Sequence, residues 1–286
     1  MKMKQTIGII GGDRRQAELA GLLAQDGHPV RTYGLEEWLP ESGCALEQAA
    51  AAEVVILPLP LCREEGILNC SRRTVPTAEL FQLLQPDALV LAGQVQAAQR
   101  AEAEASGTVL HDYFRREEVT VANAAATAEA ALRVAMEHSV ESLLGMECLI
   151  LGFGRIGKLL CSRLHGLGAR VTAAARKPAD LAWIRAYGWK PLEIAHLDGS
   201  LGAFRLVYNT VPARVLDRPL LLQLPRKCLC VELASVPGID LTAAEELGLP
   251  CVRAGSLPGR MVPRTAAEIL RRAVRQIILE ERGNAE

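Results

Sequence analysis

The segment that most constrains the fold is 148–160, which reads CLILGFGRIGKLL. Apolar residues typical of a strand lead into a G-x-G-x-x-G turn, and apolar residues at helical spacing follow it. In such a turn the first glycine allows a tight reversal, the second lets the backbone approach a pyrophosphate, and the third brings helix and strand together. The N–H groups at the start of the helix then attract the anion. We therefore predict a dinucleotide site, with a Rossmann-like fold that has lost its ligand as the alternative. The residues expected to form it are Gly152, Phe153, Gly154, Arg155, Ile156 and Gly157.

The choice of cofactor depends on the end of the second strand of this domain, predicted at Arg170 to Ala175. An acidic residue there would bind the ribose 2′-hydroxyl of NAD. The strand is followed instead by Arg176 and Lys177, two cations that would neutralise the 2′-phosphate of NADP. A guanidinium can also stack on adenine. The sequence therefore predicts NADP, and the alternative is that both residues are ordinary solvated charges.

Two later strands of this domain end in small polar loops. The first is LVYNTVP at 206–212 and the second is VELAS at 231–235. Ligands of open α/β sheets bind at the carboxyl ends of the strands. We expect these loops to contact the nicotinamide end of the cofactor, through Asn209, Thr210, Val211, Pro212 and Ala234.

The order of the elements predicts an α/β fold with two Rossmann-like, doubly wound parallel-sheet domains. Short β-branched runs alternate with helical patterns in the first half, as in a Rossmann-like or flavodoxin-like domain. An alanine-rich run then predicts a long bridging helix, and a terminal amphipathic helix is expected to pack back on the N-terminal domain. A cleft between the domains is the default place for a small ligand. The predicted parts are the substrate domain 1–122, the bridging helix 123–145, the NADP-binding domain 146–262 and the terminal helix 263–286.

Composition excludes several classes of function. The net charge of -1 attracts neither nucleic acid nor an anionic membrane. Neither a membrane span nor a signal segment is visible, which suggests a cytoplasmic protein. The eight cysteines include no C-x-x-C pair, so we expect buried free thiols and no metal. None of the five histidines lies beyond His196, and none is assigned to catalysis.

The first strand ends in a second glycine turn, GGDRRQ at 11–16. Its adjacent glycines do not form a G-x-G-x-x-G motif, so a second dinucleotide is not expected. Two arginines at a helix N-terminus suit a small carboxylate. The alternative, Asp13 as an N-cap with exposed arginines, stays equally open.

Several segments together resemble one family, the A subunit of bacterial dipicolinate synthase, and the resemblance runs nearly end to end. Besides the glycine motif, the matching segments are IIGGD with Arg15 and Gln16, VILP at 55–58, Asn123, Thr127, Glu129, NTVP at 209–212, LAS with Pro237 and Gly238, and LPG at 257–259 with PRTA at 263–266. Two positions depart from the pattern, since a polar residue is expected at Val236 and a glycine at Ser256.

The resemblance implies an NADP-linked oxidation of dihydrodipicolinate, or of its hydrated precursor, to dipicolinate during sporulation. It also implies that the partner is a flavoprotein-like B subunit and that the location is the mother-cell cytoplasm, with a homo-oligomer left open. A dicarboxylate substrate calls for cations and polar groups, for which the candidates are Arg15, Asn123, Thr127 and Arg264. The catalytic candidates are Glu129, as proton acceptor, and Ser235. Capping or hinge hydrogen bonds are the alternative roles.

Two other functions remain open from the sequence. An NADP-dependent 2-hydroxyacid-type dehydrogenase would have the same layout, but its acid–base histidine would fall beyond His196, where this chain has none. A non-catalytic nucleotide-binding scaffold subunit is the other.

Overall fold

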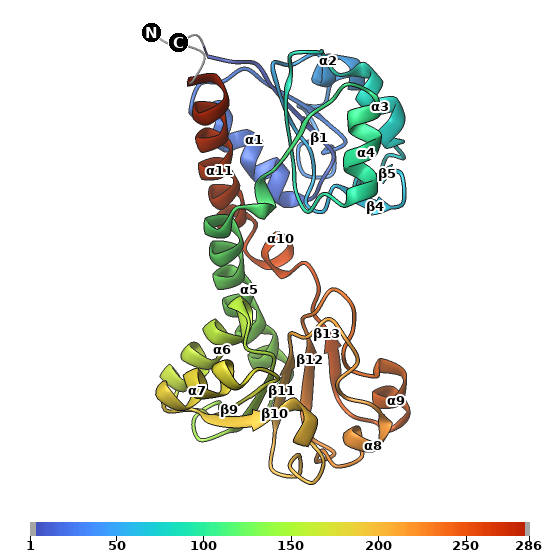
Figure 1. The fold of residues 1–286 in the computed structure, drawn as a ribbon. Helices are drawn as coiled ribbons and strands as arrows, with labels where there is room; N and C mark the ends of the chain where they lie inside the picture. The colour runs from blue at the N-terminus through green and yellow to red at the C-terminus, as the bar shows by residue number, and fades with distance from the viewer. Residues whose placement is uncertain (1–3, 284–286) are drawn as a thin grey trace. The chain divides into compact units, whose positions relative to one another are not determined.

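The computed structural model describes residues 4–283, which form two compact units (Figure 1). The first unit combines the chain up to Asn123 with the chain from Pro258 onward, and the second is Ala124–Leu257. The return to the first unit lies earlier in the chain than the boundary expected after residue 262. The reason is the short helix α10 (Leu257–Met261), in which Gly259 packs against residues of the first unit.

The first unit contains a five-stranded parallel sheet with the order β2-β1-β3-β6-β7. Ile7 of β1 stands opposite Val30 on one side and Val54 on the other. Apart from a separate two-stranded hairpin, this is the flavodoxin-like order. The strands are β1 (Ile7–Ile10), β2 (Val30–Tyr33), β3 (Val54–Ile56), β6 (Leu89–Ala92) and β7 (Leu110–Asp112), and the hairpin is β4 (Cys62–Glu64) with β5 (Ile67–Leu68).

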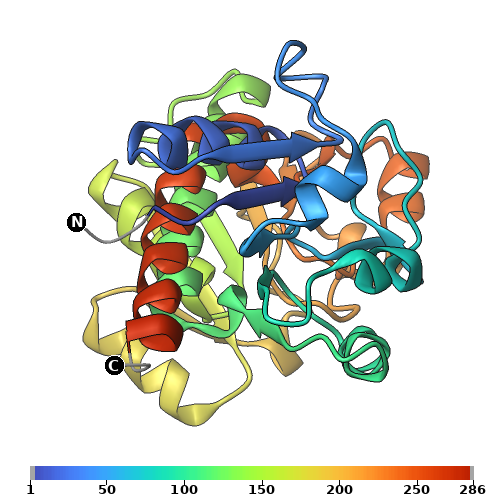
Figure 2. The same ribbon diagram turned by 90° about the horizontal axis from the view of Figure 1, so that it is seen from above.

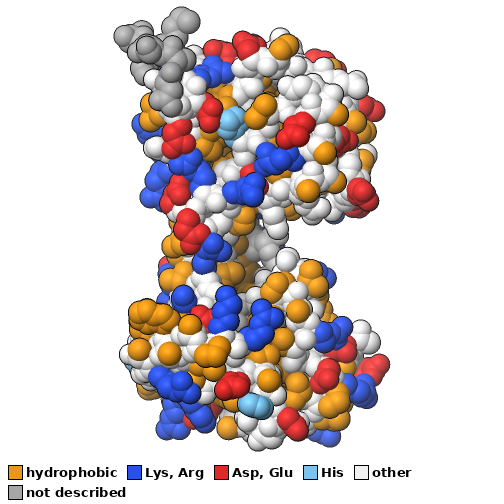
Figure 3. Space-filling view, in the orientation of Figure 1, with side chains coloured by type: hydrophobic (Ala, Val, Ile, Leu, Met, Phe, Trp, Pro, Cys, Tyr) orange, Lys and Arg blue, Asp and Glu red, His pale blue; other side chains and the backbone are white. Residues whose placement is uncertain are grey.

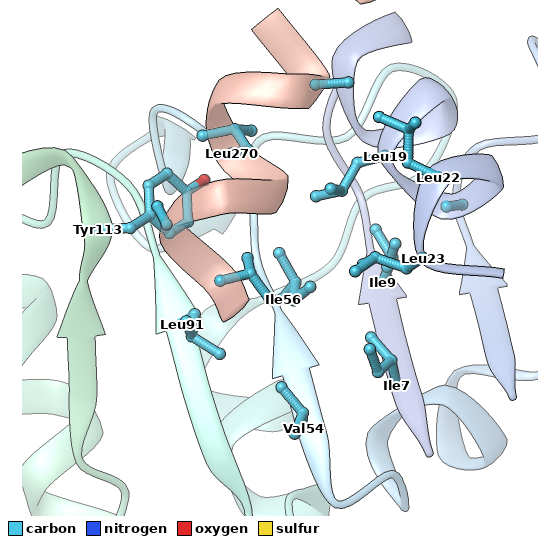
Figure 4. Close-up of a cluster of buried hydrophobic side chains, with 14 of the residues drawn as sticks. Ile7, Ile9, Leu19, Leu22, Leu23, Val54, Ile56, Leu91, Tyr113 and Leu270 are labelled. Atoms are coloured by element: carbon cyan, nitrogen blue, oxygen red, sulfur yellow. The ribbon is translucent and has the colours of Figure 1, made fainter. Parts of the chain in front are cut away.

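Helices cover both faces of this sheet, as its apolar strands require. On one face, Ile7 and Ile9 pack against α1 (Arg14–Gln25) and α11 (Pro263–Gly283), and Figure 4 shows this cluster with Leu270 of α11 in it. The opposite face is covered by α2 (Leu46–Ala50), α3 (Thr77–Leu83) and α4 (Ala97–Ala105).

The terminal helix packs on the N-terminal domain, as predicted. Figures 1 and 2 show α11 running alongside α1. The Arg271 Nε of α11 donates to Asp26 Oδ2 at 2.7 Å, and this bond lowers the pKa of the Asp26 carboxyl. Arg116 likewise bonds Glu280 and lowers the pKa of that carboxyl to about 2. Apolar packing and these ion pairs together hold α11 against the rest of the first unit.

The second unit contains a six-stranded parallel sheet with the order β10-β9-β8-β11-β12-β13. Renumbered within the unit, this is the 3-2-1-4-5-6 order of dinucleotide-binding folds, so the predicted fold class is confirmed. The strands are β8 (Glu147–Leu151), β9 (Arg170–Ala175), β10 (Lys190–Glu193), β11 (Leu206–Asn209), β12 (Leu229–Glu232) and β13 (Cys251–Arg253). The helices are α6 (Arg155–Gly166), α7 (Pro178–Ala186), α8 (Arg218–Leu221) and α9 (Leu241–Glu246).

The long helix α5 occupies Glu117–His138, and its predicted bounds of 123–145 are therefore wrong at both ends. It begins earlier because Glu117 and Glu118 in its first turn suit the positive end of the helix dipole. It ends earlier because the Ser139 hydroxyl accepts a hydrogen bond from the Glu141 N–H at 3.1 Å, which replaces a helical bond.

The surface charge agrees with the composition, and the prediction of buried thiols is correct for five of the eight cysteines, while Cys44, Cys62 and Cys251 are half-buried. Figure 3 shows acidic and basic side chains interspersed over both units. All eight cysteines are free, and burial raises the pKa of the Cys148 and Cys161 thiols to about 12, which makes them unreactive. Within residues 4–283, none of the helices combines the length and hydropathy needed to cross a bilayer.

Candidate functional site

The glycine turn between β8 and α6 has the geometry that a dinucleotide requires. Gly152 has a φ of +97°, and a methyl group there would lie 2.4 Å from Thr210 Oγ1. A methyl group at Gly157 would lie 2.1 Å from the Gly152 carbonyl oxygen. A methyl group at Gly154, the N-cap of α6, would meet no heavy atom within 4 Å. The outer glycines therefore serve close packing, whereas the middle glycine faces open space above the helix N-terminus.

The other residues of the turn differ in orientation. Phe153 is 5% exposed, and its ring contacts Trp189 edge to face with a centroid distance of 6.1 Å. The buried ring of Phe153 therefore anchors the turn, and it is the backbone of Phe153 that can contact a ligand. Arg155 is exposed and Ile156 is half-buried in the first turn of α6.

Arg176 and Lys177 lie where the sequence places the 2′-phosphate contact, directly after β9. Both side chains are exposed. Lys177 is also the N-cap of α7, and Pro178 occupies the first turn of that helix. Since β9 pairs with β8, the two cations follow the strand next to the glycine turn.

The structure brings the two predicted loops to the same sheet edge as the glycine turn. β11 pairs with β8 on one side and with β12 on the other, all in parallel. Thr210 is half-buried and its hydroxyl donates to the Leu151 carbonyl at 2.8 Å. Val211 and Ala234 are half-buried, and Pro212 and Ser235 are exposed. These loop residues and the glycine turn therefore surround one set of adjoining strand ends.

Asn209 differs from its loop neighbours because its side chain is fully buried and directed into the protein. Its Nδ2 donates to both oxygens of Glu232, at 2.8 and 3.0 Å, and to the Val211 carbonyl at 3.0 Å. Glu232 is a site residue that the sequence reasoning did not identify. The available signal was a carboxylate closing the apolar run LCVE, where a fully buried strand leaves it no solvent.

The substrate candidates of the first unit are Arg15, Asn123 and Arg264. Arg15 is 5% exposed and forms hydrogen bonds of 2.8 to 3.1 Å with the Asp13 carboxylate, while its Nη2 donates to the Leu59 carbonyl at 2.7 Å. Asp13 is indeed the N-cap of α1, but the expectation of exposed arginines holds only for Arg14, whose side chain is 58% exposed.

Arg264 begins α11 with ion pairs to Glu18 at 3.6 Å and to Glu268 at 3.5 Å. Asn123 is the last residue of the first unit before the chain passes into the second.

Two candidates on α5 belong to the second unit. Thr127 is 7% exposed. The Glu129 side chain is 63% exposed and pairs with Arg163 of α6 at 3.2 Å. If Glu129 accepts the proton, its carboxylate does so while it is paired with Arg163.

The strand order, the glycine turn and the two α/β units form a fold that two-domain nicotinamide-nucleotide dehydrogenases share. An L-alanine dehydrogenase structure shares the fold with a TM-score of 0.63, at 15% identity, over 96% of this chain and 90% of that chain.

More particular matches come from dipicolinate synthase. Residues 6–114 match the family model that describes the N-terminal domain of the dipicolinate synthase A subunit. The A subunit of dipicolinate synthase from Bacillus subtilis is 26% identical over 284 residues, which is 96% of this chain and 96% of the relative. The crystal structure of the Bacillus subtilis A chain matches with a TM-score of 0.85 at 25% identity, over 99% of each chain. The resemblance predicted from the sequence is thus confirmed: the chain is similar to the A subunit of dipicolinate synthase over nearly its whole length.

Proposed function

We propose that this chain is the NADP-dependent dehydrogenase subunit of a dipicolinate synthase, which oxidises dihydrodipicolinate or its hydrated precursor to dipicolinate in sporulation. The observation that carries the proposal is the glycine turn at the centre of a Rossmann sheet, with two cations, Arg176 and Lys177, directly after the neighbouring strand. Similarity to the A subunit of dipicolinate synthase over 96% of the chain supports the substrate class.

The chemistry makes modest demands on the protein. A dihydropyridine ring loses a hydride and a proton and becomes aromatic, so much of the driving force lies in the substrate; the hydrated precursor must in addition lose one water molecule. When bound, the nicotinamide accepts the hydride; the proton passes to water or to a side chain, for which Glu129 and Ser235 are the candidates. The protein mainly positions the reactants. Arg176 and Lys177 would hold the 2′-phosphate, and the loops after β11 and β12 would bind the nicotinamide end.

The activity is tested directly by mixing the protein with fresh dihydrodipicolinate-pathway intermediate and NADP, with and without a flavoprotein-like B subunit. We expect reduction of the nicotinamide together with formation of dipicolinate, because NADP supplies the oxidant. Binding of NADP without reduction in either mixture would favour the scaffold role. Turnover of a 2-hydroxyacid, with none of the dihydropyridine, would favour the other dehydrogenase.

The cofactor preference depends on Arg176. Replacing it by alanine is expected to weaken NADP binding by about tenfold to a hundredfold, the loss of a charge-assisted hydrogen bond, and to leave NAD binding nearly unchanged. Calorimetric titration with both nucleotides measures the two Kd values. Arg185→Ala is the matched control, because it removes an exposed cation from the last turn of α7. An equal loss for NADP and NAD would show that Arg176 does not bind the 2′-phosphate.

A further inference from the structure

Glu232 is a buried carboxylate that accepts hydrogen bonds from two separate segments, the end of β11 and the loop after β12. Its exposed fraction is 0%. Asn209 Nδ2 donates to both of its oxygens. The backbone N–H of Ala234 donates to Oε1 at 2.8 Å, and those of Gly238 and Ile239 donate to Oε2, each at 2.9 Å. Each of these partners is a donor, so the side chain serves purely as an acceptor.

This arrangement is not explained by packing alone. Burying a carboxylate is unfavourable unless hydrogen bonds replace its hydration, and within residues 4–283 Glu232 takes part in no ion pair. Amide groups from the end of β11 and from the loop after β12 supply the replacement. The carboxylate therefore connects the end of β11 with the loop after β12, in the stretch between the last paired strand residues, 209 and 232, and the parallel bridge that Leu216 forms with Ile239.

A continuous series of contacts leads from this carboxylate to the glycine turn. Asn209 Oδ1 accepts the Val211 N–H at 3.1 Å, and Asn209 Nδ2 donates to the Val211 carbonyl at 3.0 Å. Thr210 and Val211 in turn pack on Gly152, where a methyl group would meet Thr210 Oγ1 at 2.4 Å and Val211 Cγ2 at 3.0 Å. Gly238 closes the back of the loop, because a methyl group there would lie 2.5 Å from Asn209 Nδ2.

We propose that Glu232 is a positioning residue for the nucleotide site. It orients Asn209, and through Asn209 it sets the course of the loop at 210–212 over the glycine turn, before any ligand binds. Glu232 itself touches no ligand. That the bound ligand is NADP rests on the proposed function, whereas the effect of Glu232 on the position of the loop does not.

The test uses the full chain and the variant Glu232→Gln, which keeps the size of the side chain but places an NH2 group against donors. We expect the Kd for NADP to rise by about tenfold, which corresponds to the loss of one hydrogen bond. We also expect faster hydrogen exchange at Val211, Ala234 and Gly238 than in the wild type. Asp240→Asn is the matched control: it neutralises a carboxylate that follows the same loop, caps α9 and pairs with Arg214 rather than with Asn209. Its NADP Kd should stay within about twofold of wild type.

A second variant, Asn209→Ala, cuts the same connection one step closer to the turn and carries the test if Glu232→Gln does not fold. Because the two residues act in series, the double variant should bind NADP no more than about twofold worse than the weaker single variant. Additive losses would overturn the proposal, and so would unchanged exchange at Val211. A wild-type protein that binds neither NADP nor NAD would instead remove the proposed function, and the exchange measurement would still decide the role of Glu232.

Discussion

Gly157→Ala is expected to abolish NADP binding and to destabilise the second unit by roughly 3 kcal/mol, the upper range for overpacking a core. The added methyl group would lie 2.1 Å from the Gly152 carbonyl oxygen, and backbone cannot move aside as a side chain can. Either α6 moves away from β8 or the turn opens, and both changes spoil the pyrophosphate site. Denaturant unfolding and calorimetric titration with NADP measure the two effects.

Two other glycines of the same segment serve as controls. Gly154→Ala should leave the free energy of unfolding nearly unchanged but weaken NADP binding, since its methyl group enters the open space that the pyrophosphate would occupy. Gly166→Ala, at the end of α6 with no neighbour within 4 Å, should change neither quantity appreciably. Normal NADP binding by Gly157→Ala would contradict the assignment of this turn.

Arg15→Ala is expected to destabilise the first unit by roughly 2–4 kcal/mol, because it strands a partly buried carboxylate and a buried carbonyl. The guanidinium is the partner of Asp13 and of the Leu59 carbonyl, and its side chain is only 6% exposed. Gly259 of α10 also packs on the Asp13–Arg15 ion pair, so loss of this ion pair should loosen α10. Arg14→Ala is the matched control, since an exposed substitution should change stability by no more than about 0.5 kcal/mol.

A substrate role for Arg15 has a different signature from this structural one. Arg15→Lys keeps a cation near Asp13 but loses the planar, bidentate geometry. If Arg15 also binds the dicarboxylate, the substrate KM should rise far more than the nucleotide Kd. Equal changes in both would leave Arg15 as a purely structural residue.

Local sequence predicted much of the second unit. The glycine turn was recognisable because its chemistry depends on residues close together in the chain, namely a strand, three glycines and an amphipathic helix. The second strand of that unit was predicted at its observed bounds, Arg170–Ala175. α1 begins after its N-cap Asp13 and ends before Gly27, which has a φ of +86°. Ser256 departs from the expected glycine but adopts a glycine-like φ of +53°.

Short or charged elements escaped prediction. β10 and β13 are strands at the edges of the sheet, formed because a neighbouring strand offers hydrogen bonds rather than because their own residues favour them. The start of α5 was missed for a different reason. Its first turns contain the β-branched residues Val119, Thr120 and Val121, which obscure the helical pattern.

The sequence by itself determined the two α/β units, the nucleotide turn and the cations beside it, because each is encoded by residues within one strand–turn–helix segment. Only the tertiary structure decided what Glu232 and Arg15 do. Each is a charged residue whose role depends on partners from other segments, Asn209 for Glu232 and Leu59 for Arg15. The run LCVE hints that Glu232 is buried, but the partners of both charges come from distant segments, which the local sequence does not identify.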